Sequence, residues 1–421
     1  MMKKVLSLLL AALLAAALMG CGENGKESAA PGTQPEGSQK EQATDTPDTK
    51  AESPAEASSD AQPEDGLEIL DKDGKRLGAI SQRASCTAAD EGIFYSVVDQ
   101  AEYALTGTAQ YRFFRLADGS DVLLGTLEDQ GYEALYARTE LDGVVYALAV
   151  TGNPFDNEPD TLWLLAFDTE KGSMEKYAVS EHGHPYAALT AVNGKLFIMN
   201  HEMTEPACDT VYVFDPAAGS VDELLSFADT AEASLRSICA AEDGFFLLRL
   251  RTADGQPQLS LDRYDSSGKK LSEKALNEMC LAALLKVQGI ISEDDAKNEL
   301  AMMVSHFSVE ESRYLFYENF SVTRLILDLE TGEALLAETD LYTMSPGGGS
   351  PVVYRINFPG DDFAGPEILA LQDGAMTQLA FTAPDERTLI QSVSHSPAGT
   401  WLVYAKDAAG SAAALILWTE P

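Results

Sequence analysis

Three histidines and one glutamate with the chemistry of metal ligands lie close together near the middle of the chain. One residue separates His182 from His184, and His201 is followed directly by Glu202. Imidazole nitrogens and carboxylate oxygens are common protein ligands of zinc and other divalent cations. The four residues form a candidate metal site, and the ordinary alternative is a set of solvated loop histidines. Apart from this open alternative, we expect no cofactor.

Aromatic and acidic residues in polar segments form a second candidate site, for a ligand rather than a metal. Phe155 and Tyr186 each stand in a polar stretch, and Asp361, Asp362 and Phe363 are consecutive. Aromatic rings at loop tips can stack on a sugar or a peptide. Neighbouring carboxylates can attract cationic groups or calcium. These five residues are our candidates for ligand binding.

Motifs that would name a reaction are absent from the sequence. It contains no Gly-x-Ser-x-Gly nucleophile turn, no phosphate loop and no dinucleotide fingerprint. His306 and His395 are single histidines in strand-like segments. Each can act as a general acid or base, or can simply pack against neighbouring backbone. We therefore predict no catalytic residue.

The elements that must position these residues repeat along 66–421. Each unit opens with a turn and an apolar strand, as in Asp142-Gly143-Val144-Val145-Tyr146, and a polar loop leads to a second alternating strand. Alternating apolar residues give strands with one buried face, and glycine accepts the left-handed backbone of the tight turn that follows. The turn glycines are Gly74, Gly119, Gly172, Gly219, Gly268, Gly332 and Gly374.

This repeat predicts an all-β fold, a β-propeller of seven four-stranded blades. The turn glycines recur at intervals of roughly 40–50 residues, which is typical of propeller blades. The folded part begins with a hairpin at 67–80, and the chain ends on a strand at 414–418. We expect these terminal strands to complete one blade and so remove an open edge. Six or eight blades are alternatives, because 67–70 and 414–418 each fit the third strand of a blade.

One interval is longer than the others and predicts a short helical insertion near 277–303. Ser292 is followed by Glu293, Asp294 and Asp295. Serine caps a helix N-terminus well, and acidic residues favour the positive end of the helix dipole. We expect a helix from this serine to about Met303.

Propeller topology brings most of the candidate residues to one face. Loops between second and third strands, and loops between blades, open on the same side of the ring. The candidate segments 153–160, 181–186, 200–205 and 359–363 all fall in such loops. His182, His184 and His201 are therefore expected to approach one another, and His306 and His395 are expected on innermost strands.

The N-terminus has the layout of a secretory signal. Lys3 and Lys4 precede an apolar run that ends before Gly20 and Cys21, and this run is short for a membrane-spanning helix. The ending resembles the bacterial lipobox, which implies acylation of Cys21 and a lipid anchor on the extracytoplasmic face of the cell membrane. An ordinary secretory signal is the alternative. We divide the chain into a signal peptide (1–20), a lipidated cysteine with a disordered linker (21–65) and a propeller domain (66–421).

Composition limits the partners of this protein. The formal net charge is −38, which disfavours nucleic acid and anionic lipid headgroups because both are recognised through Lys and Arg. We expect a monomer. Cys86, Cys208, Cys239 and Cys280 permit disulfides of unknown pairing in an exported chain, but we expect mainly buried thiols.

A segment near the C-terminus resembles a known family. Ser396-Pro397-Ala398-Gly399-Thr400-Trp401-Leu402 is similar to the Ser-Pro-Asp-Gly-x-x-Leu motif of propellers like the periplasmic protein TolB, with Ala398 in place of the usual aspartate. The other repeats resemble those of quinoprotein-like and WD40-like propeller lipoproteins. The resemblance implies the fold, but it transfers no activity because propellers host many functions.

The sequence favours a surface-anchored propeller that binds a protein, peptide or glycan on its loop face. Two alternatives stay open. One is a metal-dependent extracytoplasmic hydrolase or lyase that uses the histidine cluster. The other is an accessory scaffold lipoprotein in envelope assembly or transport. We regard an enzyme as the less favoured class.

Overall fold

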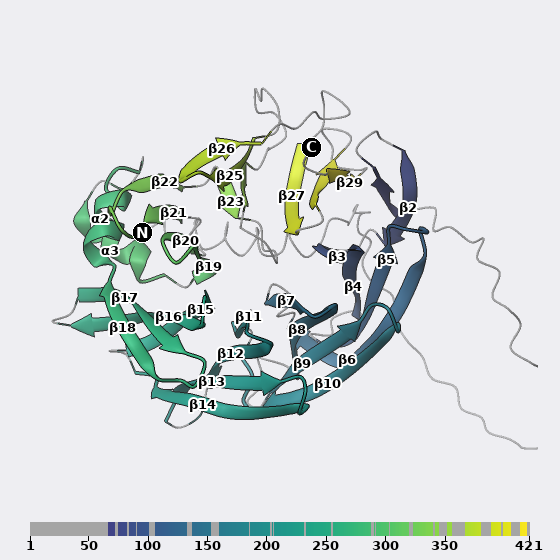
Figure 1. Cartoon of the computed structure of the whole chain (residues 1–421), viewed down its shortest axis with the longest axis horizontal. Coiled ribbons are helices and arrows are strands. Elements are labelled where there is room, and N and C mark those ends of the chain that lie inside the picture. Colours follow the sequence, from purple (N-terminus) through teal and green to yellow (C-terminus); the bar gives the residue numbers. More distant parts are fainter. Residues whose placement is uncertain are drawn as a thin grey trace, which may run out of the picture. The chain divides into compact units, whose positions relative to one another are not determined.

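Six β-sheets in the described part of the chain form the seven blades of a propeller, because the eight-stranded sheet spans blades 1 and 2 through the pairing of β6 with β8 (Figure 1). The computed structural model describes residues 66–418 with internal gaps. The gaps are 72–74, 82–83, 90, 101–105, 133–136, 153–159, 185, 203, 205, 231–232, 254–255, 288–289, 291, 303, 320–322, 340–341, 345–351, 356–366, 380–388, 397–398 and 406–412. The predicted all-β propeller with a short helical insertion is confirmed.

The strands of each blade are given from the innermost outward. Blade 1 contains β3 (Ala84–Ala89), β4 (Gly92–Gln100), β5 (Gly107–Arg115) and β6 (Asp121–Tyr132). Blade 2 contains β7 (Arg138–Leu141), β8 (Val144–Thr151), β9 (Thr161–Asp168) and β10 (Ser173–Ser180). Blade 3 contains β11 (Ala188–Val192), β12 (Lys195–Glu202), β13 (Cys208–Asp215) and β14 (Ser220–Ala228). Blade 4 contains β15 (Ala233–Ala241), β16 (Gly244–Ala253), β17 (Gln256–Asp265) and β18 (Lys270–Ala275).

The remaining blades complete the ring. Blade 5 contains β19 (Val304–Glu310), β20 (Tyr314–Asn319), β21 (Thr323–Asp328) and β22 (Ala334–Thr339). Blade 6 contains β23 (Tyr342–Met344), β24 (Val352–Arg355), β25 (Ile368–Gln372) and β26 (Ala375–Gln378). Blade 7 contains β27 (Leu389–Ser396), β28 (Gly399–Ala405), β29 (Ala413–Trp418), β1 (Gly66–Leu70) and β2 (Arg76–Ser81). Innermost strands of neighbouring blades contact one another, as β11 contacts both β7 and β15, and β27 contacts β3.

Blade 7 is built from both ends of the described chain, and it has five strands. β1 pairs in parallel with β29, so that Glu68, Ile69 and Leu70 lie opposite Ala414, Leu415 and Ile416. β2 then pairs with β1 in the antiparallel sense. The predicted closure is confirmed. The two segments that each fitted a third strand run side by side in one sheet, which explains the ambiguity in blade number.

The hairpin turns follow the predicted Asp-to-Gly pattern. Gly172 has a φ of 67°, a conformation that glycine adopts without a steric penalty. The Asp168 carboxylate accepts the Lys171 N–H at 2.8 Å within the same turn. The other predicted turn glycines with positive φ are Gly119, Gly219, Gly268, Gly332 and Gly374. Gly74 lies outside the described residues.

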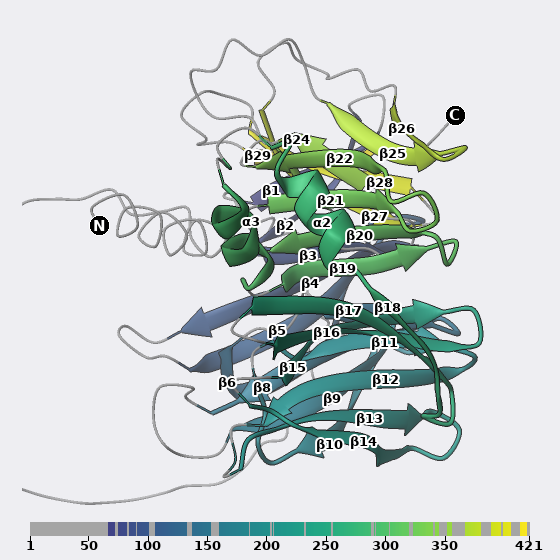
Figure 2. The same cartoon turned by 90° about the vertical axis from the view of Figure 1, so that its left-hand side faces the viewer.

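The helical insertion between β18 and β19 contains two helices, α2 (Asn277–Leu284) and α3 (Glu293–Leu300). The Ser292 hydroxyl accepts the Asp295 N–H at 3.1 Å, which confirms the predicted cap. Figure 2 shows the helices beside blades 4 and 5, and they contact β17, β21 and β22. In the part of the chain that the structure describes, no helix has the length and hydropathy to span a membrane.

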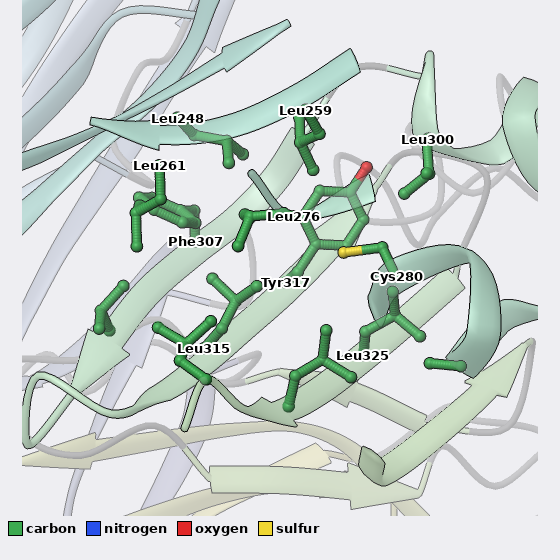
Figure 3. Packing of buried hydrophobic residues seen from close by; sticks show 14 of the residues in the cluster. Leu248, Leu259, Leu261, Leu276, Cys280, Leu300, Phe307, Leu315, Tyr317 and Leu325 are labelled. Carbon is green, nitrogen blue, oxygen red and sulfur yellow. The ribbon is translucent and has the colours of Figure 1, made fainter. Parts of the chain in front are cut away.

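Each hydrophobic core lies between two neighbouring blades, so the middle strands are buried on both faces. The core between blades 4 and 5 includes Leu248 and Leu261 on one side and Leu315 and Tyr317 on the other, and the insertion adds Cys280 (Figure 3). Cys239 and Cys280 are buried free thiols, and Cys208 is a half-buried one. The side chain of Cys86 is outside the described set. The expectation of buried thiols is confirmed for Cys239 and Cys280.

The closing strand β1 supports a first prediction. Ile69 is 0% exposed, so Ile69→Ala should lower the free energy of unfolding by about 2–5 kcal/mol through lost burial and cavity formation. Leu123→Ala is the control, because Leu123 is 46% exposed and such changes stay within about 0.5 kcal/mol. Urea unfolding measures both. Equal small effects would show that β1 is not part of the cooperative ring.

Candidate functional site

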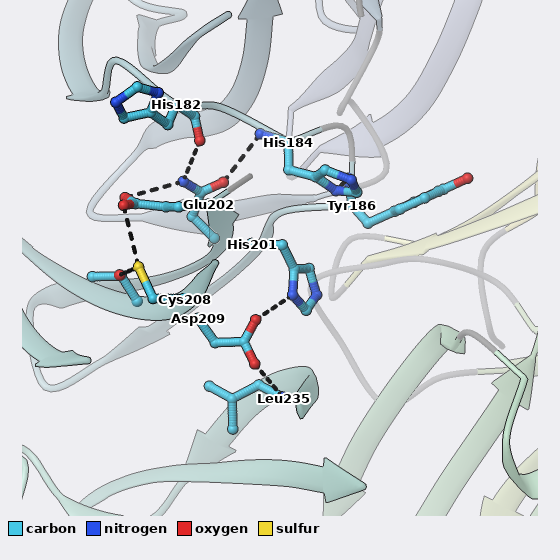
Figure 4. A network of polar contacts seen from close by, with 10 residues as sticks. His182, His184, Tyr186, His201, Glu202, Cys208, Asp209 and Leu235 are labelled. Atoms are coloured by element: carbon cyan, nitrogen blue, oxygen red, sulfur yellow. Dashed lines mark hydrogen bonds and ion pairs between the residues drawn. The ribbon is translucent and has the colours of Figure 1, made fainter. Parts of the chain in front are cut away.

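The loop between β10 and β11 and the end of β12 bring two of the three predicted histidines together on the loop face of blade 3. Figure 4 shows His184 and His201 facing one another, with the ring of His182 turned away from both. The rings of His184 and His201 have centroids 5.6 Å apart and meet edge to face. Of the three histidines that were expected to approach one another, His184 and His201 do so, and His182 does not.

Glu202 belongs to a different set of contacts. It follows His201 on β12, and consecutive strand residues point to opposite faces. Its carboxylate accepts hydrogen bonds from the Ser180 hydroxyl at 2.9 Å and from the Tyr212 hydroxyl, and the Cys208 thiol lies 3.6 Å away. Burial and the bond to Glu202 raise the pKa of Tyr212. This carboxylate therefore connects β12 and β13 of blade 3 with the end of β10 in blade 2.

The four predicted metal ligands therefore do not converge. His182 is tied through its backbone, since its N–H donates to the Ser180 hydroxyl and its carbonyl accepts from the Asn200 amide. Among the described residues, no group of three or more histidine, cysteine or acidic side chains is arranged to hold a metal ion. Of the four predicted metal ligands, only His184 and His201 have rings that face one another.

His184 is held as a neutral ring by its surroundings. Its backbone N–H donates to the Asn200 side-chain oxygen at 3.1 Å, and its Nδ1 accepts the Tyr186 N–H at 3.2 Å. Burial, together with the nearby His201, lowers the pKa of His184 to about 4. The ring centroid of Tyr186 is 5.1 Å away. Since Nδ1 is an acceptor, the ring proton of neutral His184 is on Nε2.

His201 is oriented by a buried carboxylate that the sequence analysis did not select. Asp209 is 0% exposed, and its Oδ1 lies 2.5 Å from His201 Nδ1. Its Oδ2 accepts the Leu235 N–H at 2.5 Å, from the first strand of blade 4. A carboxylate can only accept here, so Nδ1 carries a proton and Nε2 is directed elsewhere. Asp209 thereby links the imidazole of blade 3 to blade 4.

Two polar atoms in this region are buried and have no hydrogen-bond partner among the described residues. They are His201 Nε2 and Arg236 Nε. Arg236 follows Leu235, and its electrostatic partners include Asp209 and Asp229. Burial raises the pKa of Asp229, and nearby Asp209 raises it further. An imidazole with one nitrogen held by a carboxylate can serve as a base, a metal ligand or, when protonated, a donor to an anion.

The other predicted site residues are only partly covered by the structure. Phe155, Asp361, Asp362, Phe363 and Cys21 lie outside the described residues. His306 and His395 lie on the innermost strands β19 and β27, as expected, and the side chain of His395 is outside the described set.

The sequence analysis missed Asp209, Asp229 and Arg236. A signal for Asp209 exists, because it stands near the start of a strand whose middle, 211–214, is apolar. A buried carboxylate needs partners, which a polar residue at a strand end can find in a neighbouring blade. No such signal exists for Arg236, whose position depends on a local irregularity of β15.

Comparison with known proteins assigns this chain to no family. No protein-family model matches the sequence, and no curated protein matches it significantly. A protein from Bacteroides uniformis provisionally named 6-phosphogluconolactonase aligns with a TM-score of 0.45 and 15% identity, over 75% of this chain and 89% of that one. The β-propeller domain of the Trilobed protease from Pyrococcus furiosus aligns with a TM-score of 0.37 and 11% identity, over 69% and 82%. At these scores the similarities carry no argument about function.

The histidines support a second prediction, on pH dependence. Burial lowers the pKa of both His184 and His306 to about 4, whereas an unfolded histidine titrates near 6.5. Between these values the unfolded chain binds more protons, so this contribution to stability is complete above pH 6.5 and decreases as the pH falls towards 4. NMR titration of the imidazole resonances should give a pKa near 4 for His184 and for His306.

The variant His184→Gln isolates this effect from the carboxylates that titrate in the same range. It should make the free energy of unfolding depend less on pH between 4 and 6.5 than it does in the wild type. A ring midpoint near 6.5 for His184, or an unchanged pH dependence in the variant, would contradict the burial of this imidazole.

Proposed function

We propose that this protein is a lipid-anchored extracytoplasmic propeller that binds a protein, peptide or glycan on the loop face. The main support is the pair of buried polar atoms, His201 Nε2 and Arg236 Nε, that have no partner among the described residues. Buried polar groups without a partner are unfavourable, and a ligand group could satisfy them. Tyr186 lies beside His184, whose ring faces that of His201, and offers an aromatic surface for stacking.

The anchor is the second part of the proposal. The basic and apolar start of the chain, followed by Cys21, supports export and acylation. The segment that follows is rich in Ala, Glu, Ser and Pro and poor in large apolar residues, which suits a spacer between the anchor and the propeller. The net charge of −38 suits a body held away from anionic lipid.

Cys21→Ala tests the anchor. We expect the wild-type chain in the membrane fraction, carrying acyl groups on an N-terminal Cys21 that intact mass spectrometry detects. The variant should lose both the acyl mass and the membrane association, because no other lipid attachment is proposed. Cys208→Ala is the control, and it should remain acylated. A variant that stays in the membrane fraction would contradict the proposed anchor.

Tyr186→Ala and Phe155→Ala test the binding face. Buried aromatic residues often dominate binding energy, so each change should weaken binding by about tenfold or more in a glycan- and peptide-binding screen. Lys171→Ala is the matched control, since Lys171 lies in the turn between β9 and β10 at the opposite face. Binding that is insensitive to both aromatic changes would contradict the proposal. A stable stoichiometric partner in a native-membrane pull-down would instead favour the scaffold role.

A further inference from the structure

The loop that carries His184 and Tyr186 is bound to the rest of the protein through its backbone. Within 182–187 every residue except the proline at 185 has an N–H group. Each of these groups has an acceptor within the protein, and the donors are His182, Gly183, His184, Tyr186 and Ala187. Surface loops are commonly more mobile than the strands they connect. The hydrogen bonds of this loop favour a single conformation instead.

One buried side-chain amide holds the centre of the loop. Asn200 on β12 is 0% exposed. Its Nδ2 donates to the His182 carbonyl at 3.0 Å, and its Oδ1 accepts the His184 N–H at 3.1 Å. A carbonyl only accepts and a backbone N–H only donates, so these partners fix the orientation of the amide. A side chain of blade 3 thus binds the peptide groups on both sides of Gly183.

Blade 2 holds the same part of the loop from its other side. The Gly183 N–H donates to the Asp160 carbonyl at 2.6 Å. A Cβ at position 183 would lie 2.6 Å from the Leu162 backbone nitrogen, so the close approach of the two chains requires glycine. The loop is therefore fixed between the start of β9 in blade 2 and the end of β12 in blade 3.

Glu202 supports Asn200 from the same face of β12. Residues two apart on a strand point to the same side, so these two side chains share a face that His201 does not. The Glu202 carboxylate lies 3.5 Å from Asn200 Nδ2 and accepts the Ser180 hydroxyl at 2.9 Å. The Ser180 oxygen in turn accepts the His182 N–H at 3.1 Å. Glu202 therefore belongs to the network that holds the loop.

The fixed backbone determines where the two rings of the loop lie. The His184 carbonyl accepts the Ala187 N–H at 3.1 Å, which closes a turn that contains Tyr186. The Tyr186 N–H donates to His184 Nδ1 at 3.2 Å, and the two ring centroids are 5.1 Å apart. A surface that is ordered before its ligand arrives avoids the entropy cost of ordering it during binding.

We propose that Asn200 is the positioning residue of the binding face, and that its amide keeps the Tyr186 ring in the orientation that receives the ligand. This inference rests on the proposed function, in which Tyr186 contacts the ligand. Without the amide, the ring would still be present, but the loop would have to be ordered during binding. Binding would then weaken although the aromatic contact is retained.

The test compares Asn200→Ala with Asn319→Ala in the full chain. Asn319 is the matched control because it is 1% exposed and its amide also binds backbone. It donates to the Glu299 carbonyl at 2.9 Å and accepts the Thr323 N–H at 3.0 Å, both near blade 5. Each variant loses one buried amide, so we expect a similar decrease in the free energy of unfolding.

Amide hydrogen exchange in the free protein is the first measurement. Asn200→Ala should exchange the His184 and Tyr186 amides about tenfold faster or more, because local opening of the loop then breaks fewer hydrogen bonds. Asn319→Ala should leave the exchange of both amides unchanged. This measurement needs no ligand, and it separates loss of loop order from a general loss of stability.

Binding to the glycan and peptide panel used for Tyr186→Ala is the second measurement. Asn200→Ala should weaken binding by about three- to tenfold, with a less favourable binding entropy by calorimetry. Asn319→Ala should bind as the wild type does. Asn200→Asp protects the test against a folding defect, because it keeps the shape of the side chain and loses only the donor to the His182 carbonyl. It should also weaken binding while unfolding stays cooperative.

The inference is overturned if the loop amides exchange equally fast in Asn200→Ala and in the wild type. Equal effects of Asn200→Ala and Asn319→Ala on loop exchange and on binding would also overturn it. If Tyr186→Ala removes binding but Asn200→Ala does not weaken it, the positioning role is wrong and the proposed binding function stands. If loop exchange changes as expected but no member of the panel binds, the proposed binding function is wrong, and the ligand-directed part of the inference is wrong with it.

Discussion

The parallel pairing of β1 with β29 is the constraint on which the other relations in this propeller depend. Sheets that bury both faces against neighbours need a neighbour on each side, so the first and last blades must meet or leave apolar strands open. The chain meets this need by placing its first strand beside its last and adding β2 outside them. The added strands make blade 7 wider than the four-stranded blades and join the two ends of the described chain.

Ring closure has a direct effect on the candidate site. With the blades held side by side, the loops of one blade reach the innermost strand of the next, and Asp209 of blade 3 can bind the backbone of blade 4. The site is therefore a product of contacts between blades. The two polar atoms without a described partner, His201 Nε2 and Arg236 Nε, come from different blades. The Asp209 carboxylate orients His201, and the bulge in β15 orients Arg236.

The same architecture separates residues that are neighbours in sequence. His201 and Glu202 are consecutive, yet one lies with His184 at the site and the other binds Tyr212 and Ser180. Spacing along the chain suggested a common cluster because both segments reach the loop face. The alternation of side chains across a strand decides otherwise. In place of the predicted four-ligand metal site, the structure has a pair of imidazoles and a buried carboxylate.

The sequence by itself determined the repeat, its turns, the capped helix at Ser292 and the need for the termini to meet, because these follow from local periodicity and from backbone preferences of glycine and serine. It also selected His184, His201 and Tyr186. The five-stranded closing blade, the link from Asp209 to Leu235 and the skipped register at Arg236 were decided by the tertiary structure. Each of these depends on contacts between strands far apart in the chain, and no local pattern records which strand becomes a neighbour.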